Sequence, residues 1–136
     1  MKRVLVGGPR SGKSTYARKL REHNIPTYCT DSKSMVKDLE DGVIYLPEGL
    51  SWSEASQFVV DHWFPMRGPW CIEGVGTVRA LRKFLAAGGK PNFTVTYFSK
   101  QYDHAVTKEG QKTLAKGVET VWREIEEQLK PHLETY

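Results

Sequence analysis

The segment Gly7-Gly8-Pro9-Arg10-Ser11-Gly12-Lys13-Ser14 constrains the fold more than any other part of this 136-residue chain. It matches the pattern Gly-x-x-x-x-Gly-Lys-Ser/Thr, whose glycines allow a tight turn between a buried strand and a helix. An apolar run over residues 3–6 precedes the segment, and a helical pattern over about residues 12–22 follows it. The sequence therefore predicts strand, loop and helix in the order that the pattern requires.

The same segment predicts a binding site for ATP or another nucleoside triphosphate. In such a P-loop, successive backbone N–H groups point inward around a phosphate, and the helix N-terminus adds its positive dipole end. Lys13 is expected to bridge the β- and γ-phosphates, and the Ser14 hydroxyl to bind Mg²⁺. The predicted nucleotide-binding residues are Gly7, Gly8, Pro9, Arg10, Ser11, Gly12, Lys13, Ser14 and Thr15.

Strand and helix patterns alternate along the rest of the chain. Four apolar runs predict buried strands at residues 3–6, 26–30, 70–73 and 93–98. Helices are predicted at about residues 12–22, 51–64, 77–87 and 111–129, and a short one at 34–39. This order predicts a single α/β domain over residues 1–136, with a parallel sheet of about four strands and helices on both faces. Only residues 130–136 follow the last helix, which argues against a further core strand.

Composition narrows the class of protein. No apolar run approaches the roughly 20 residues that a membrane span needs, and 26% of the residues are charged, so we expect a cytoplasmic protein with no membrane partner. Cys29 and Cys71 form no C-x-x-C pair, which predicts reduced thiols without a disulfide framework. The net charge of +4 suits an anionic ligand.

The layout resembles the small P-loop kinases, the group that holds adenylate, shikimate, gluconate and polynucleotide kinases. It also resembles short P-loop proteins encoded by phages, which would act in the host cytoplasm. Ile72-Glu73-Gly74-Val75, the following Arg79-Ala80-Leu81-Arg82 and the helix over residues 111–122 carry this resemblance beyond the P-loop. It implies a three-layer P-loop NTPase fold and an ATP-dependent phosphotransferase. The N-K-x-D motif of GTPases is absent.

Two carboxylates are expected at the carboxyl ends of strands, where ligands bind in open α/β sheets. Asp31 follows the second predicted strand and is expected to orient or deprotonate an acceptor hydroxyl. Its alternative role is to shape a turn. Glu73 ends the third predicted strand, at the Walker B place of the resembling kinases, and is expected to help bind Mg²⁺. The predicted catalytic residues are Lys13, Asp31, Glu73 and Arg79.

Arg79 and Arg82 lie one helical turn apart after the third predicted strand. With Asp31 they are the predicted acceptor-binding residues, because two guanidinium groups can clamp a phosphate; the alternative is a solvated helix face. The resembling kinases usually carry lid arginines after the fourth strand, and residues 99–110 contain none, although Lys100 and Lys108 are present.

Tryptophan raises two further hypotheses. Trp52 or Trp63 is a candidate for lining an acceptor pocket. Trp52, Trp63 and Trp122 together are many large aromatic residues for a small chain and also suit a dimer interface. The sequence does not distinguish a monomer from a homodimer.

Three functions are compatible with these features. The first is transfer of the γ-phosphoryl group of Mg-ATP to a small acceptor, most simply a nucleoside or a nucleotide. The second is transfer to the 5′-hydroxyl end of a nucleic acid, for which Lys33, Lys37, Arg79 and Arg82 would supply a basic channel. The third is a nucleotide-binding module that acts through a partner, which the absence of a lid arginine favours.

Overall fold

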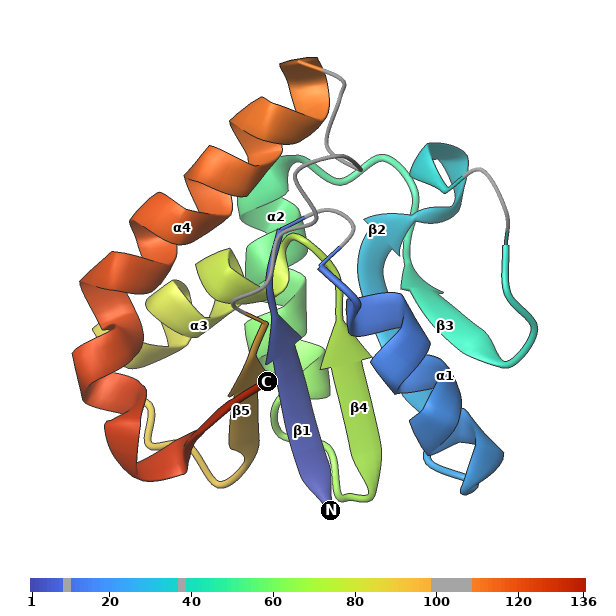
Figure 1. The fold of residues 1–136 in the computed structure, drawn as a ribbon, viewed down its shortest axis with the longest axis horizontal. Helices are drawn as coiled ribbons and strands as arrows, with labels where there is room; N and C mark the ends of the chain where they lie inside the picture. Colours follow the sequence, from blue (N-terminus) through green and yellow to red (C-terminus); the bar gives the residue numbers. More distant parts are fainter. Residues whose placement is uncertain (9–10, 37–38, 99–108) are drawn as a thin grey trace.

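Six parallel strands form one sheet in the computed structural model, which describes residues 1–8, 11–36, 39–98 and 109–136. Their spatial order is β3-β2-β4-β1-β5-β6. Every neighbouring pair is parallel, so the carboxyl ends share one edge of the sheet, the upper edge in Figure 1. The strands are β1 (Lys2–Val6), β2 (Thr27–Ser32), β3 (Val43–Leu46), β4 (Trp70–Glu73), β5 (Thr94–Tyr97) and β6 (Leu133–Thr135).

The prediction of about four strands is wrong, because β3 and β6 were not predicted. β3 is the apolar run Val43–Leu46, as long as the predicted strands at residues 3–6 and 70–73, so the sequence carried a signal for it that was overlooked; it lies at one edge of the sheet, where Ile44 is 48% exposed. β6 has three residues and lies at the other edge. Contacts from distant residues fix it there: Arg3 pairs with Glu134 at 2.8 Å, and the Tyr136 N–H donates to the Tyr97 carbonyl at 2.8 Å. Such long-range contacts leave no local sequence signal.

The four main helices lie where the sequence predicts them, namely α1 (Lys13–Glu22), α2 (Trp52–Phe58), α3 (Thr77–Ala86) and α4 (Glu109–Leu129). Ser51 caps α2 by accepting a bond from the Glu54 N–H at 3.1 Å, and the Glu54 carboxylate accepts from the Ser51 N–H at 3.0 Å. A π-helical segment (Val59–Trp63) continues α2. The short helix predicted at 34–39 is one 3₁₀ turn, η1 (Lys33–Met35), although residues 37–38 lie outside the described ranges. Within those ranges, no helix combines the length and the apolar character needed to cross a membrane.

Helices cover both faces of the sheet, as predicted. The chain moves in one direction across the sheet from β1 to β2 and in the opposite direction from β3 to β6. Right-handed crossovers therefore place α1 on one face and α2, α3 and α4 on the other (Figure 1). Two apolar clusters reflect this division. Leu5 and Cys71 pack with Ala17 of α1, whereas Val4, Val6 and Ile72 pack with the other helices.

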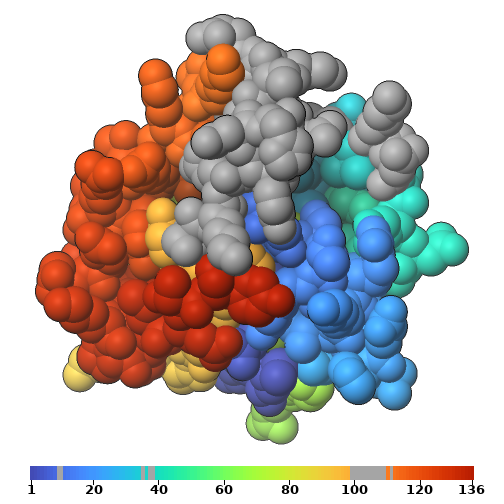
Figure 2. Space-filling view, in the orientation of Figure 1, coloured from blue at the N-terminus to red at the C-terminus, as the bar shows by residue number. Residues whose placement is uncertain are grey.

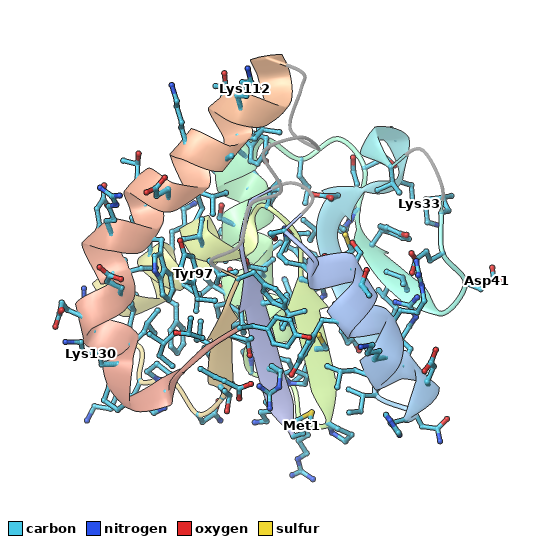
Figure 3. The ribbon with its side chains drawn as sticks, viewed as in Figure 1. Met1, Lys33, Asp41, Tyr97, Lys112 and Lys130 are labelled. Carbon is cyan, nitrogen blue, oxygen red and sulfur yellow. The ribbon has the colours of Figure 1, made fainter. Side chains whose placement is uncertain are left out.

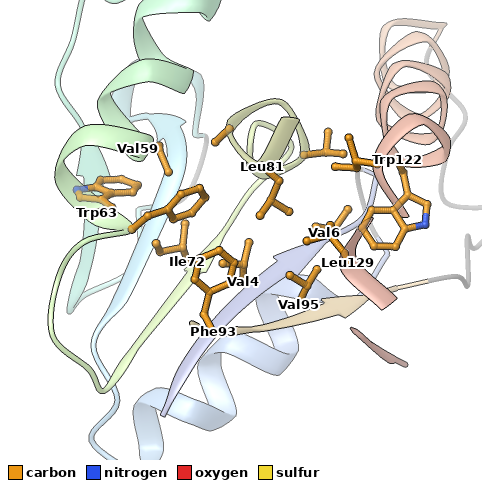
Figure 4. Packing of buried hydrophobic residues seen from close by; sticks show 14 of the residues in the cluster. Val4, Val6, Val59, Trp63, Ile72, Leu81, Phe93, Val95, Trp122 and Leu129 are labelled. Carbon is orange, nitrogen blue, oxygen red and sulfur yellow. The ribbon is translucent and has the colours of Figure 1, made fainter. Parts of the chain in front are cut away.

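The larger cluster supplies most of the core. α3 lies between the α2 region and α4 in Figure 4, with Leu81 over the strand residues Val4 and Val6. Trp63 and Trp122 lie in this cluster, with exposed fractions of 5% and 2%. Of the three tryptophans considered for an interface, Trp52 is therefore the one at the surface, where it is 49% exposed.

The C-terminal segment returns to the helix that follows the P-loop. Figure 2 shows this segment (red) against α1 (blue), and the Tyr136 ring meets the Tyr16 ring with centroids 5.3 Å apart. Phe98 joins them, with its ring 5.6 Å from Tyr16 and 5.0 Å from Tyr136. These ring contacts link the segment after β6 to α1 at the carboxyl ends of the strands, where the predicted site lies.

Candidate active site

The P-loop lysine is buried inside its own loop. Gly12 precedes α1 with φ of +102°, a left-handed conformation that favours glycine. Lys13 is only 5% exposed, and its Nζ donates to the Gly8 carbonyl at 2.6 Å and to the Ser11 Oγ at 3.3 Å. No side chain of the described residues caps this helix start, so its first N–H groups have no side-chain acceptor among them. The arrangement suits an anion.

β2 packs closely against the turn that follows β4, next to the two predicted carboxylates. The Gly76 N–H donates to the Thr30 Oγ1 at 3.1 Å. Gly74 has φ of +125°, and a Cβ at this position would overlap the Thr30 Oγ1 and lie 3.0 Å from the Thr30 nitrogen. Asp31 follows Thr30 and Glu73 precedes Gly74, so this contact adjoins both carboxylates along the chain.

An irregularity in β2 determines where Asp31 lies. Cys29 pairs with Tyr45 of β3, but Ser32 pairs with the next residue, Leu46, so Thr30 and Asp31 form a bulge. Bulges redirect side chains at sheet edges and near active sites. β2 runs to Ser32, so Asp31 lies within the strand rather than just after it as predicted.

The three charged groups at this end of the sheet influence one another. Burial lowers the pKa of Lys13, while Glu73 and Asp31 act in the opposite direction. Burial raises the pKa of Asp31, and Lys13 opposes that shift. Burial likewise raises the pKa of Glu73, which is 9% exposed, against the effects of the Cys29 thiol and Lys13. Two carboxylates and one ammonium thus share a poorly solvated space.

A polar pocket of about 110 Å³ joins the P-loop helix to these carboxylates. Ser14 of α1 lines it together with Asp31 and Glu73. Glu40 borders the same pocket and pairs with both Arg18 and Arg21 of α1, which tie the segment before β3 to that helix. Ser14 and Glu73, the predicted Mg²⁺ ligands, therefore face one space.

Asp31 also lines a second pocket, of about 80 Å³, which we call the apolar pocket. Asp31 is thus shared by a polar space beside α1 and a mainly apolar space. Trp52, one of the two predicted pocket residues, lines the apolar pocket, whereas Trp63 is buried in the core. The described lining residues are Thr30, Asp31, Ser32, Leu46, Pro47, Leu50, Ser51, Trp52 and Ala55.

The two predicted arginines have different surroundings. The Arg79 Cζ lies 5.1 Å from the centroid of the Trp52 ring. Arg82 is exposed and pairs with Glu124 of α4 at 3.3 Å. Arg79 therefore contacts a wall of the apolar pocket, whereas Arg82 belongs to a surface ion pair between α3 and α4.

Several predicted residues fall outside the described part of the chain. These are Pro9 and Arg10 of the P-loop, Lys37 of the basic channel, and Lys100 and Lys108 of the lid segment. Lys33 is described; it lies on η1, directly after β2 (Figure 3).

Sequence reasoning missed the residues that support the site. Thr30, Gly74 and Gly76 act through a contact between strands that are far apart along the chain. Thr77 donates its hydroxyl to the Leu5 carbonyl at 2.7 Å, which ties the start of α3 to β1. Gly74, directly after a carboxylate that ends a strand, was the one local signal of a close backbone approach.

Replacing Gly74 by alanine tests the close packing of β2 and β4. We expect Gly74→Ala to lower the free energy of unfolding by about 2–4 kcal/mol, because left-handed strain and overlap with Thr30 add together. Gly88→Ala is the matched control: Gly88 also has positive φ (+83°), but its Cβ would meet nothing within 4 Å, so a loss of only about 1 kcal/mol is expected. Urea denaturation measures both. Equal losses would show that the contact with Thr30 is unimportant.

The buried carboxylates predict how stability changes with pH. A carboxyl group whose pKa is raised by folding stabilises the protein below its unfolded value and loses that contribution as pH rises through its folded value. The ordinary values are 3.8 for Asp31 and 4.5 for Glu73, so the loss begins near pH 4 and grows upward. We therefore expect Glu73→Gln to raise the melting temperature at pH 7 but not at pH 4. If thermal melts showed that Glu73→Gln raises the melting temperature more at pH 4 than at pH 7, this prediction would be wrong.

No family model matches the chain, and no curated protein matches it. Any functional conclusion therefore depends on the residues and geometry of the site itself.

Proposed function

We propose that this protein is a P-loop NTPase of the three-layer type that transfers the γ-phosphoryl group of Mg-ATP, or of another nucleoside triphosphate, to a small acceptor such as a nucleoside or a nucleotide. The place of Asp31 in the lining of both pockets carries the proposal. One pocket adjoins Ser14 and Glu73 and suits the triphosphate end, whereas the other is mainly apolar and suits an acceptor. A donor and an acceptor bound in this way would meet at Asp31.

The proposed reaction is a direct displacement at the γ-phosphorus. Asp31 accepts the proton of the acceptor hydroxyl, and the acceptor oxygen forms the new bond to phosphorus. The bond from the γ-phosphorus to the bridging oxygen breaks, and ADP leaves with the electron pair. The raised pKa of Asp31 supports this role, because a more basic carboxylate is a better proton acceptor. The Lys13 ammonium, buried in the P-loop, would offset charge on the phosphates.

The residues at the site suit Mg²⁺ bound jointly by protein and nucleotide. The described residues hold no group of three His, Cys, Asp or Glu side chains that would bind a metal by themselves. Mg²⁺ commonly takes one or two protein ligands together with phosphate oxygens and water. Ser14 and Glu73 would supply the oxygen ligands, and the ion would neutralise charge on the triphosphate.

The other two functions predict different measurements. A kinase for nucleic-acid 5′ ends needs a basic approach to Asp31. Arg82 pairs with Glu124 and Arg79 lies against Trp52, so neither arginine supports such an approach directly. A binding module would hold ATP without turnover stimulated by an acceptor.

A panel of acceptors tests the proposal. ADP formation from Mg-ATP is measured with nucleosides, nucleoside monophosphates and 5′-hydroxyl oligonucleotides. We expect stimulation by at least one small acceptor. Stimulation by oligonucleotides alone would favour the nucleic-acid kinase, and tight ATP binding without stimulation by any acceptor would favour the binding module.

A further inference from the structure

Trp52 differs from the other tryptophans in being exposed within a pocket. It is 49% exposed, whereas Trp63, Trp70 and Trp122 are 5%, 1% and 2% exposed. It lines the apolar pocket, in which Asp31 is the one charged residue among the described lining residues. A large aromatic ring is thus available to a ligand in the pocket that holds the proposed catalytic carboxylate.

Arg79 supports this ring from outside the pocket. Its guanidinium Cζ lies 5.1 Å from the centroid of the indole, within the range of a cation–π contact. The same guanidinium also lies close to α4, because a Cβ at Gly117 would lie 3.4 Å from the Arg79 Nη2. Arg79 is not among the described residues that line the pocket. The guanidinium therefore lies close to both the indole and α4, so it is placed to restrict the orientation of the ring.

The rest of the pocket suits a flat apolar ligand that carries a hydroxyl group. Leu46, Pro47, Leu50 and Ala55 provide apolar surface. The Thr30 and Ser51 hydroxyls already accept structural hydrogen bonds, from Gly76 and from Glu54. The Asp31 carboxylate is the strongest remaining acceptor for a ligand hydroxyl.

We propose that Trp52, oriented by Arg79, selects acceptors that carry a flat aromatic ring. The ring lies against Trp52 in the apolar pocket, and a hydroxyl of the same molecule lies at Asp31. This inference rests on the proposed function, since it names the acceptor class of that site. It also gives Arg79 a positioning role in place of the predicted clamp on an acceptor phosphate.

Direct binding tests the role of Trp52. Calorimetry with excess Mg-ADP, which fills the P-loop site, measures the affinity of adenosine and thymidine, with ribose as a control that lacks the ring. We expect Trp52→Ala to weaken nucleoside binding about tenfold or more, as stacking of a base on an aromatic side chain implies, and Trp52→Phe to retain most of it. Ile44→Ala removes a similarly exposed side chain from outside both pockets and should have no effect. Ribose binding as tightly as the nucleosides, or unchanged binding by Trp52→Ala, would overturn the inference.

A second pair of variants separates the two roles of Arg79. If Arg79 acts through Trp52, Arg79→Gln weakens the binding of a nucleoside and of its 5′-monophosphate by the same factor, and Arg79→Lys retains part of that affinity. Neither Arg79 variant then adds to the loss of affinity caused by Trp52→Ala. If Arg79 binds an acceptor phosphate, only the monophosphate loses affinity, and that result would overturn the positioning role.

The inference and the proposed function can fail separately. Nucleoside binding that depends on Trp52, without ADP formation for any acceptor, supports the ring site and rejects the phosphotransferase. The opposite result is efficient transfer to hydroxyl compounds without a ring, equal to transfer to nucleosides and unchanged by Trp52→Ala. That result supports the phosphotransferase and rejects the ring site.

Discussion

Replacing Lys13 by alanine should abolish ADP formation stimulated by an acceptor, with a fall in kcat/KM of at least about 10³-fold. Lys13 is buried in the P-loop and donates to the Gly8 carbonyl and the Ser11 hydroxyl. Its ammonium is thus held beside the backbone that would surround a phosphate. Alanine removes the positive charge that would offset the phosphates in the proposed reaction, and it also leaves Asp31 and Glu73 without their cation. A coupled assay for ADP measures the loss.

A second lysine on the same helix provides the control. Lys19 is exposed on α1, away from the loop, so Lys19→Ala should retain the activity of the unmodified protein. Circular dichroism and thermal melts of both variants check that the fold is intact. Full activity in a folded Lys13→Ala protein would reject the P-loop as the phosphate site.

The parts of this fold that the sequence predicts are those with local causes. The loop and α1 follow from a glycine pattern between an apolar run and a helical pattern, and Gly12 adopts the positive φ that such a turn requires. The α2 boundary follows from the hydrogen bonds of the Ser51–Glu54 capping box. In each case residues within a few positions determine the conformation, so reading the chain in short windows suffices.

The remaining parts depend on contacts between distant residues. β6 lies beside β5 because of a three-residue pairing, strengthened by Arg3 of β1. The bulge in β2 becomes visible only once β3 pairs with it, and β3 was itself missed. Neither feature has a periodicity long enough to detect in the sequence.

The candidate site divides in the same way. Asp31 and Glu73 could be predicted because the carboxyl ends of parallel strands meet at one edge. The contact of Thr30 with Gly74 and Gly76, which lies next to both carboxylates along the chain, could not be predicted. Arg79 was noticed for its charge, but its contact with Trp52 depends on how α3 lies beside α2. Residue type therefore indicated which groups take part, and packing determines their roles.

Replacing Asp31 by asparagine should lower kcat by about 10²–10⁴-fold, the usual contribution of a general base, with little change in ATP binding. Asparagine keeps the size of the side chain but removes its ability to accept the acceptor's proton. Lys13, Ser14 and Glu73 remain in place, so the triphosphate end of the site should be preserved. A loss in kcat with unchanged affinity for ATP would separate a catalytic role from a structural one.

Stability provides an independent readout for the same variant. Burial raises the pKa of Asp31, which means that its charged form is held at a cost near neutral pH. Asp31→Asn should therefore be at least as stable as the unmodified protein at pH 7, although it is much less active. Asp41→Asn, at the exposed turn before β3 (Figure 3), is the control and should change neither property. If Asp31→Asn loses stability and activity together, Asp31 shapes the bulge in β2 rather than taking part in the reaction.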